Sequence, residues 1–173
     1  MKSRKFTSLT MALMATAAMM GCADMSQSSL MSSSRNFAEE VTFNNTFEFE
    51  SSKLALRKSK NPEVRAFAQQ MLSEHRLTEN RLVSAIDRSQ VRNVPFDNEL
   101  DSRHEAILQD LQRSSGADFD RKYMDAQRRA HSNTVVFLRD YAIRGEDPAL
   151  VGFAQETLPK VENHERQVYN MNY

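Results

Sequence analysis

Four side chains capable of binding a metal lie on separate stretches of this chain. Glu48, His75, His131 and His164 each fall on a segment whose apolar residues recur with a helical period. Counted from two predicted turns near residues 60 and 146, all four lie at similar depths along their helices. Imidazole nitrogens and a carboxylate oxygen are donors that suit Zn²⁺, Fe²⁺ and Cu²⁺. The spacing therefore predicts one mononuclear transition-metal site, holding Zn, Fe or Cu.

The same histidines are also compatible with a purely structural role. A histidine on a buried helical face needs a hydrogen-bonding partner, because burying an unpaired polar group is unfavourable. Candidate partners along the chain are Asn45, Glu48, Tyr123 and Gln127. The alternative to metal binding is thus a non-catalytic structural or partner-binding protein. No catalytic residue is assigned, and an oxidase or catalase activity would rest on analogy of fold alone.

A symmetric di-iron centre is not predicted. Such bundles use two Glu-x-x-His pairs, and this sequence contains none. Asp101 and His104 have a related spacing but lie on the predicted connection between two helical hairpins. The chain's internal repeat also pairs His75 with Val161 rather than with His164. Any site is therefore asymmetric.

That repeat determines the predicted architecture. Asn61-Pro62, followed by Phe67-Ala68-Gln69, recurs as Asp147-Pro148, followed by Phe153-Ala154-Gln155. In both copies an Asn or Asp is placed to cap a helix that has proline at its first position. Each copy is typical of a helical hairpin, so the fold predicted is all-α: a ferritin-like four-helix bundle built from a duplicated hairpin, with a short crossover helix.

The predicted helices follow from caps and breakers. The first runs from an N-cap at Asn36 to about Ser59, and the strand-like alternation around Phe47 is interpreted as helix because strong helix formers flank it. The others run from 61 to about 89, from a cap at Asp97 to about 114, from 117 to 144, and from 147 onwards. Pro95 breaks the chain before the crossover helix, and Pro159 is expected to kink the last one.

The N-terminus has the features of an export signal. Lys2, Arg4 and Lys5 precede an apolar stretch that ends in Gly21-Cys22, a pattern similar to the lipidation site of bacterial lipoproteins. The predicted organisation is a signal peptide over 1–21, a Ser-rich flexible tether over 22–35 and a bundle domain over 36–173. We expect the protein on the periplasmic side of the cell envelope, anchored to a membrane by lipid on Cys22. The residue that follows the cysteine, Ala23, predicts that this membrane is the outer membrane.

Composition removes several other classes. The 23 basic residues are balanced by 23 acidic ones, which argues against a nucleic-acid partner. Cys22 is the single cysteine, so a disulfide or a thiolate metal site within the domain is excluded. The sequence does not identify a protein partner.

Several segments together resemble one bacterial family, the domain of unknown function 4142. The matching residues are Glu48 and Ala55; Asn61-Pro62-Glu63-Val64, Phe67-Ala68, Met71 and Glu74-His75; Gly116, Phe119-Asp120, Tyr123, Gln127 and His131; and Phe153-Ala154, Thr157-Leu158-Pro159 and His164. The family usually has Asp where this chain has Glu74. The resemblance implies a ferritin-like fold in an exported protein, often a lipoprotein, and selects the same four candidate residues. It implies no reaction.

Overall fold

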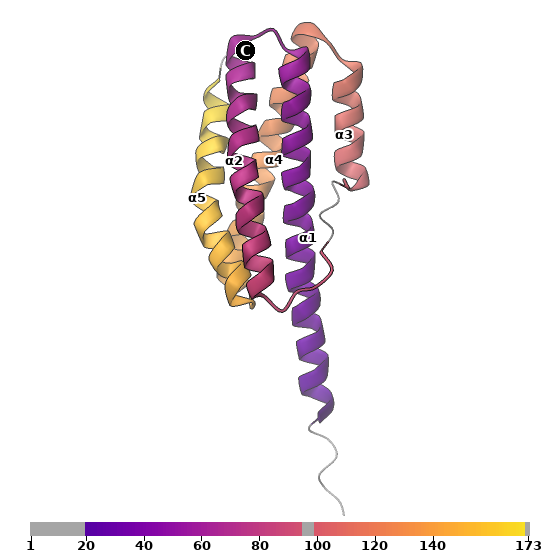
Figure 1. The fold of residues 1–173 in the computed structure, drawn as a ribbon, viewed down its shortest axis with the longest axis vertical. Coiled ribbons are helices and arrows are strands. Elements are labelled where there is room, and N and C mark those ends of the chain that lie inside the picture. Colours follow the sequence, from indigo (N-terminus) through magenta and orange to yellow (C-terminus); the bar gives the residue numbers. More distant parts are fainter. Residues whose placement is uncertain (1–19, 95–98, 172–173) are drawn as a thin grey trace, which may run out of the picture.

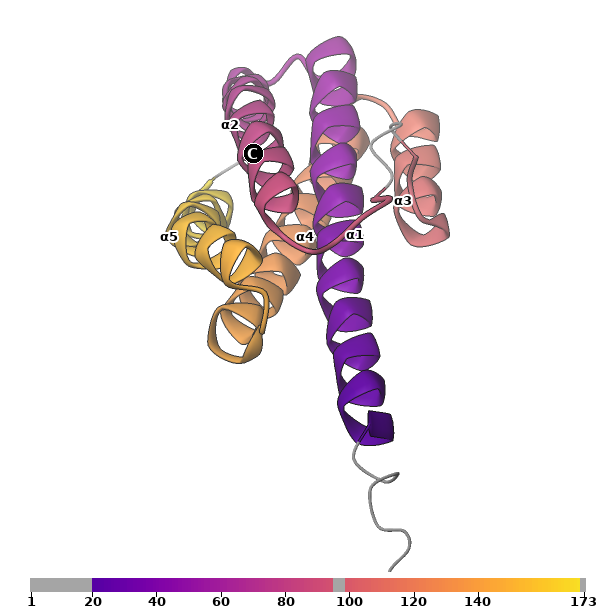
Figure 2. The ribbon, with the colours of Figure 1, turned by 60° about the horizontal axis from the view of Figure 1, so that its bottom comes forward.

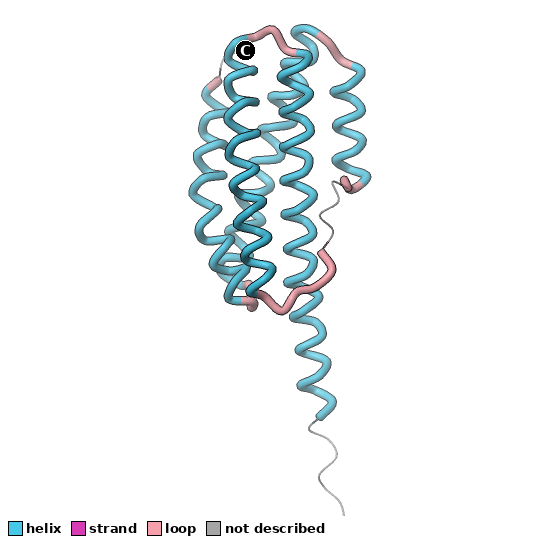
Figure 3. Tube along the Cα trace, in the orientation of Figure 1, coloured by secondary structure: helices cyan, strands magenta, loops and turns pink. Residues whose placement is uncertain are grey.

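A computed structural model describes residues 20–94 and 99–171, which form five α-helices and no strand (Figures 1 and 3). The helices are α1 (Met20–Lys58), α2 (Pro62–Arg88), α3 (Ser102–Arg113), α4 (Gly116–Arg144) and α5 (Pro148–Asn170). Among these described helices, none has both the length and the apolar character needed to span a membrane.

The four long helices form the predicted bundle of two hairpins. α1 packs against α2, and α4 packs against α5. The hairpins meet where α2 contacts α5 and α1 contacts α4. α3 lies outside this group against α1 and α4, on the side of α1 away from α5 (Figures 1 and 2). The all-α, ferritin-like prediction with a short crossover helix is confirmed.

The two copies of the repeat start their helices by the same local chemistry. Asn61 Oδ1 accepts hydrogen bonds from the backbone N–H groups of Glu63 and Val64, at 2.9 and 3.3 Å. Asp147 Oδ1 accepts from those of Ala149 and Leu150, at 3.0 and 3.2 Å. Each cap satisfies N–H groups that have no partner within the helix. This duplication places the turns of both hairpins at matching positions.

The start of the first helix differs from the expectation. The predicted N-cap at Asn36 is wrong, because α1 begins at Met20 and continues through Asn36. No glycine or proline follows Gly21 until Pro62, so nothing in the sequence forces a break. Phe37 and Ala38 are buried in the bundle, so α1 packs against the other helices from this point onward. The N-terminal part of α1 projects beyond the other helices (Figures 1 and 2).

Other predictions about the connections and the leader are only partly covered. Pro95 and Asp97 lie outside the described residues, and the described cap of α3 is Asp101. α5 continues through Pro159 without interruption. Most of the predicted signal peptide, residues 1–19, also lies outside the described part, and so does the side chain of Cys22. The domain boundaries stay predictions.

Two apolar clusters form the core, one toward each end of the bundle. The first contains Phe37, Val41, Leu82, Leu138 and Val161, and the second contains Leu54, Met71, Tyr123, Met124 and Val168. On every long helix the candidate site residue falls between the two clusters: Glu48 on α1, His75 on α2, His131 on α4 and His164 on α5. The bundle therefore has a polar layer between two hydrophobic layers.

Candidate metal centre

The three histidines of this polar layer converge on one point. Their ring centroids lie 6.2 Å apart for His75 and His131, 6.1 Å for His75 and His164, and 5.4 Å for His131 and His164. Each offers a ring nitrogen, and these nitrogens all lie within 4.8 Å of one another. The rings and Glu48 line a common cavity of about 330 Å³ between the helices.

Hydrogen bonds fix the tautomers of His75 and His131. The Nδ1 atom of His75 lies 2.9 Å from Oδ1 of Asn45, and that of His131 lies 2.9 Å from the backbone oxygen of Gln127. A carbonyl oxygen only accepts, so both Nδ1 atoms carry the proton and donate. Each Nε2 therefore keeps its lone pair, as in histidines that bind metals through Nε2.

His164 has the opposite tautomer. Its Nε2 lies 2.6 Å from Oε2 of Glu74, a carboxylate that accepts the N–H. The other oxygen of Glu74 accepts from Gln70 at 2.9 Å, which holds the carboxylate in place. Burial alone would raise the pKa of Glu74, but the hydrogen bonds from His164 and Gln70 outweigh it, so the pKa is lowered. Nδ1 of His164 is thus left with the free lone pair.

These three remaining nitrogens are buried and have no hydrogen-bonding partner among the described residues: His75 Nε2, His131 Nε2 and His164 Nδ1. Buried ring nitrogens without partners are uncommon because desolvation is unfavourable. One nitrogen of each ring lies within 4.8 Å of one nitrogen of each of the other two rings, which puts three such atoms within about 2.8 Å of a shared centre, and a Zn–N bond measures about 2.0–2.1 Å. Small side-chain shifts would bring them to bonding distance, so the residues fit a bound transition metal.

The charge states of the histidines also suit a metal. Burial lowers the pKa of His75 well below 6.5, and proximity to His131 and His164 lowers it further. Burial also lowers the pKa of His131, although Glu48 and the Gln127 carbonyl counteract part of that effect. Both rings are therefore neutral at neutral pH, and a neutral imidazole can bind a metal without first losing a proton.

Glu48 lines the same cavity, but its carboxylate is not part of the group of ligand atoms that lie within 4.8 Å of one another. It is almost fully buried, and neither carboxylate oxygen has a partner among the described residues. Gln127, its polar neighbour, donates to Oγ of Ser51 at 3.2 Å. Burial raises the pKa of Glu48, and His131 and Gln127 offset only part of the rise. A nearby divalent cation would reverse this effect by favouring the charged carboxylate.

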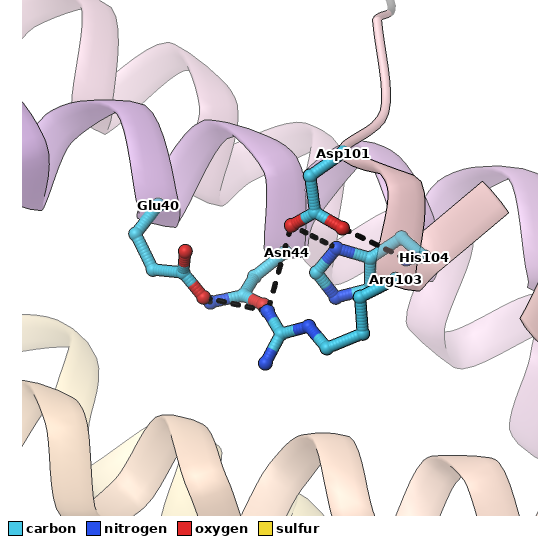
Figure 4. Close-up of polar contacts among 5 residues, drawn as sticks. All are labelled: Glu40, Asn44, Asp101, Arg103 and His104. Atoms are coloured by element: carbon cyan, nitrogen blue, oxygen red, sulfur yellow. Dashed lines mark hydrogen bonds and ion pairs between the residues drawn. The ribbon is translucent and has the colours of Figure 1, made fainter. Parts of the chain in front are cut away.

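The fourth histidine, His104, has a structural role (Figure 4). Asp101 caps α3: its Oδ1 accepts from the backbone N–H of His104 at 2.8 Å, and its Oδ2 lies 2.9 Å from His104 Nδ1. Arg103 joins Asp101 to Glu40 on α1, with Arg103 to Glu40 at 2.7 Å. Asn44 also contacts Glu40, at 3.5 Å. This network attaches α3 to α1.

Sequence reasoning anticipated one partner of the triad and missed another. Asn45 was among the expected partners, and it bonds His75. Glu74 was not expected, because adjacent residues on a helix point in different directions. Its side chain reaches across from α2 to His164 on α5.

The fold and this site define a class: a ferritin-like helical bundle whose core encloses a histidine-lined cavity. The chain belongs to the family described as a domain of unknown function, DUF4142, whose model matches residues 20–171. Among solved structures it is similar to one described as "CopM in the Cu(II)-bound form", with a TM-score of 0.65 and 16% identity over 79% of this chain and 93% of that chain. At this identity the likeness shows the fold. No curated protein sequence matches significantly.

Proposed function

We propose that this protein is an envelope lipoprotein that binds one transition-metal ion in the centre of its bundle. The observation that carries the proposal is the convergence of three histidine rings, each of which has a buried nitrogen without a hydrogen-bonding partner among the described residues. His75, His131 and His164 would hold the ion, and Glu48 would supply a carboxylate beside them. The polar contacts of Asn45, Gln127 and Glu74 orient the three rings.

Cu(II) is the first metal to test. The donor set contains nitrogen and carboxylate oxygen, and no sulfur atom lines the described cavity. Such a set suits Zn²⁺, Fe²⁺ and Cu²⁺, and Cu²⁺ is bound most tightly in the usual order of divalent metals. The similar fold of a protein described in a Cu(II)-bound form supports the same choice.

Metal analysis of protein purified without a polyhistidine tag tests the proposal. We expect about one equivalent of Cu(II) after reloading, with bound nitrogen visible by electron paramagnetic resonance. His104→Gln is the matched control, because His104 bonds the α3 cap Asp101 and does not line the cavity, and it should bind as much metal as the wild type. Less than a few tenths of an equivalent of Cu(II), Zn²⁺ or Fe²⁺ in the wild type would refute the proposal.

A second measurement separates metal binding from a structural role. If the histidines only specify helix packing, His131→Leu should leave stability unchanged or improved with or without metal, as when buried polar groups are replaced by apolar ones. If they bind metal, the variant should lose the stabilisation that Cu(II) gives the wild type. Thermal unfolding of both proteins, with and without Cu(II), distinguishes the two outcomes.

The lipoprotein part of the proposal depends on Cys22. We expect cells given an alkyne-labelled fatty acid to label the wild type and to place it in the membrane fraction. Cys22→Ser should be unlabelled and released from membranes, because its side chain cannot form the thioether. Unlabelled wild type in the soluble fraction would contradict the anchor without affecting the metal site.

A further inference from the structure

The central cavity is larger than a metal ion requires. Its volume of about 330 Å³ compares with about 30 Å³ for one water molecule in the liquid and lies within the usual range of small-molecule pockets, about 300–1,000 Å³. The histidines and Glu48 occupy one part of its wall. The remainder carries the hydroxyls of Thr78, Thr134 and Thr157 and the cationic side chains of Arg81 and Lys160.

Several of these groups have no partner among the residues that the structure describes. Oγ1 of Thr157 is buried and forms no hydrogen bond with a described residue, although Thr157 is only 3% exposed. By contrast, Oγ1 of Thr78 donates to the backbone oxygen of Glu74 at 3.0 Å. Arg81 is exposed and Lys160 is half-buried, and neither forms an ion pair with a described residue. A buried hydroxyl without a partner among the described residues is free to form a hydrogen bond with a bound molecule.

The balance of charge identifies the sign of that ligand. Glu48 and Glu74 are the two carboxylates of the cavity wall, and a divalent ion would balance both. Arg81 and Lys160 then remain as uncompensated positive charges at the wall. Positive charge of this kind lowers the local concentration of free metal cations and raises that of anions.

We propose that the cavity binds a small anion next to the metal ion, with a carboxylate as the class to be tested. This inference rests on the proposed metal site. The anion would bind the metal ion at a position that the three histidines leave open. If Glu48 also binds the metal, a position for the anion is still available, because such ions can take a fifth ligand. Thr157 would donate a hydrogen bond to it, and Arg81 and Lys160 would attract it.

Anion titration of the Cu(II)-loaded full chain tests this proposal. Azide serves as the reporter, because its binding to Cu(II) produces a charge-transfer absorption, and formate serves as the competing carboxylate. We expect the double variant Arg81→Gln, Lys160→Met to bind azide and formate about tenfold more weakly, since each exposed charge contributes modestly. Neutral imidazole should bind the variant and the wild type within about twofold of each other.

The matched control is Lys60→Met, Arg113→Gln, which removes the same charge at exposed positions that do not line the cavity. It should bind azide like the wild type. Wild type that holds one Cu(II) but gives no response to azide would overturn the anion site and leave the metal site intact. Equal azide affinity in the double variant and its control would overturn it as well. Should the double variant fail to fold, as judged by circular dichroism, Lys160→Met alone takes its place, with about a threefold loss expected.

Wild type that binds no metal would refute both proposals together. The metal content of every variant is therefore measured first. Thr157→Val adds an independent readout: it preserves shape and charge, so it should weaken formate more than imidazole and leave Cu(II) content unchanged. An equal change for both ligands would contradict the hydrogen bond from Thr157.

Discussion

Two regions of the molecule place buried histidines beside oxygen acceptors: the middle of the bundle and the start of α3. In both, a ring N–H faces an oxygen, from Asn45, Gln127 or Glu74 in the bundle and from Asp101 at α3. In the bundle, three rings from three helices leave a buried nitrogen free. His104, on α3, is a single ring that packs against Phe47 of α1 in a tilted arrangement, with 4.9 Å between ring centroids.

The difference shows which feature makes a site. Burial and an acidic partner are common to both regions, and burial lowers the pKa of His104 despite the opposing effect of Asp101. What distinguishes the triad is the convergence of three rings, each with an unpartnered buried nitrogen among the described residues. His104 and its capping network therefore serve as an internal control for each prediction below.

The largest expected effect is the loss of one triad ring. His131→Gln should lower Cu(II) affinity more than about 100-fold, because it removes a ligand and not merely a group that orients one. His104→Gln should leave the affinity within about twofold of wild type. Competitive titration against a chelator of known affinity measures both, and similar losses in the two variants would end the distinction between the two regions.

Bound metal should stabilise the fold through the triad alone. A ligand at 100 times its dissociation constant adds about 2.7 kcal/mol to the free energy of unfolding, or roughly 5–10 °C in Tm for a chain of this size. Removing the metal with a chelator should reverse the shift in wild type and in His104→Gln. His131→Gln should show no shift, and a shift of the same size there would place the metal elsewhere.

A smaller effect is expected from the group that orients His164. Glu74→Gln removes the charge that accepts from His164 Nε2 and should weaken Cu(II) binding about tenfold, at the lower end of the range for such partners. Asp101→Asn makes the same chemical change beside His104 and should not alter binding. Unchanged affinity in Glu74→Gln would mean that the His164 tautomer is set by other contacts.

The smallest effect concerns the α3 cap. Asp101→Ala should lower the free energy of unfolding by about 1 kcal/mol, typical for loss of an N-cap. Burial would raise the pKa of Asp101, but the backbone N–H of His104 and the nearby His104 and Arg103 side chains hold it below 3.8. A lowered folded-state pKa gives stability that is fully present above the unfolded-state pKa and is lost as the pH falls through the folded-state pKa.

Denaturant unfolding across pH checks this sign. The difference between wild type and Asp101→Ala should be constant near neutral pH and shrink only when the pH falls below 3.8. Metal affinity at neutral pH should not change. A difference that grows in acid would contradict the capping role.

Local sequence signals were sufficient for most of the fold. Asn61-Pro62 and Asp147-Pro148 predict helix starts because capping and the missing proline N–H act over a few residues. A residue that can cap a helix does not by itself prevent a helix from continuing through it. Asn36 therefore satisfies the local rule for a helix start, although α1 begins at Met20. Similarly, Asp101 rather than Asp97 is the described cap of α3, since either Asp satisfies the local rule.

The candidate residues were also found from the sequence, because histidines on apolar helical faces at matching depths are visible as a pattern. The pattern did not show which of the four histidines share one site, because His104 also lies on an apolar helical face. Glu74 could not be assigned from its neighbour His75, because its partner His164 lies on another helix.

The sequence by itself determined the family, the duplicated hairpin and the polar layer, because caps, periodicity and repeats are local properties of the chain. Tertiary structure decided which ring nitrogen of each histidine is free, since the acceptors of two of them, Asn45 and Glu74, come from other helices. It also decided that Glu48 faces the triad without joining it, and that Thr157, Arg81 and Lys160 line the same cavity. These properties depend on distances between separate helices, which no spacing along one helix specifies.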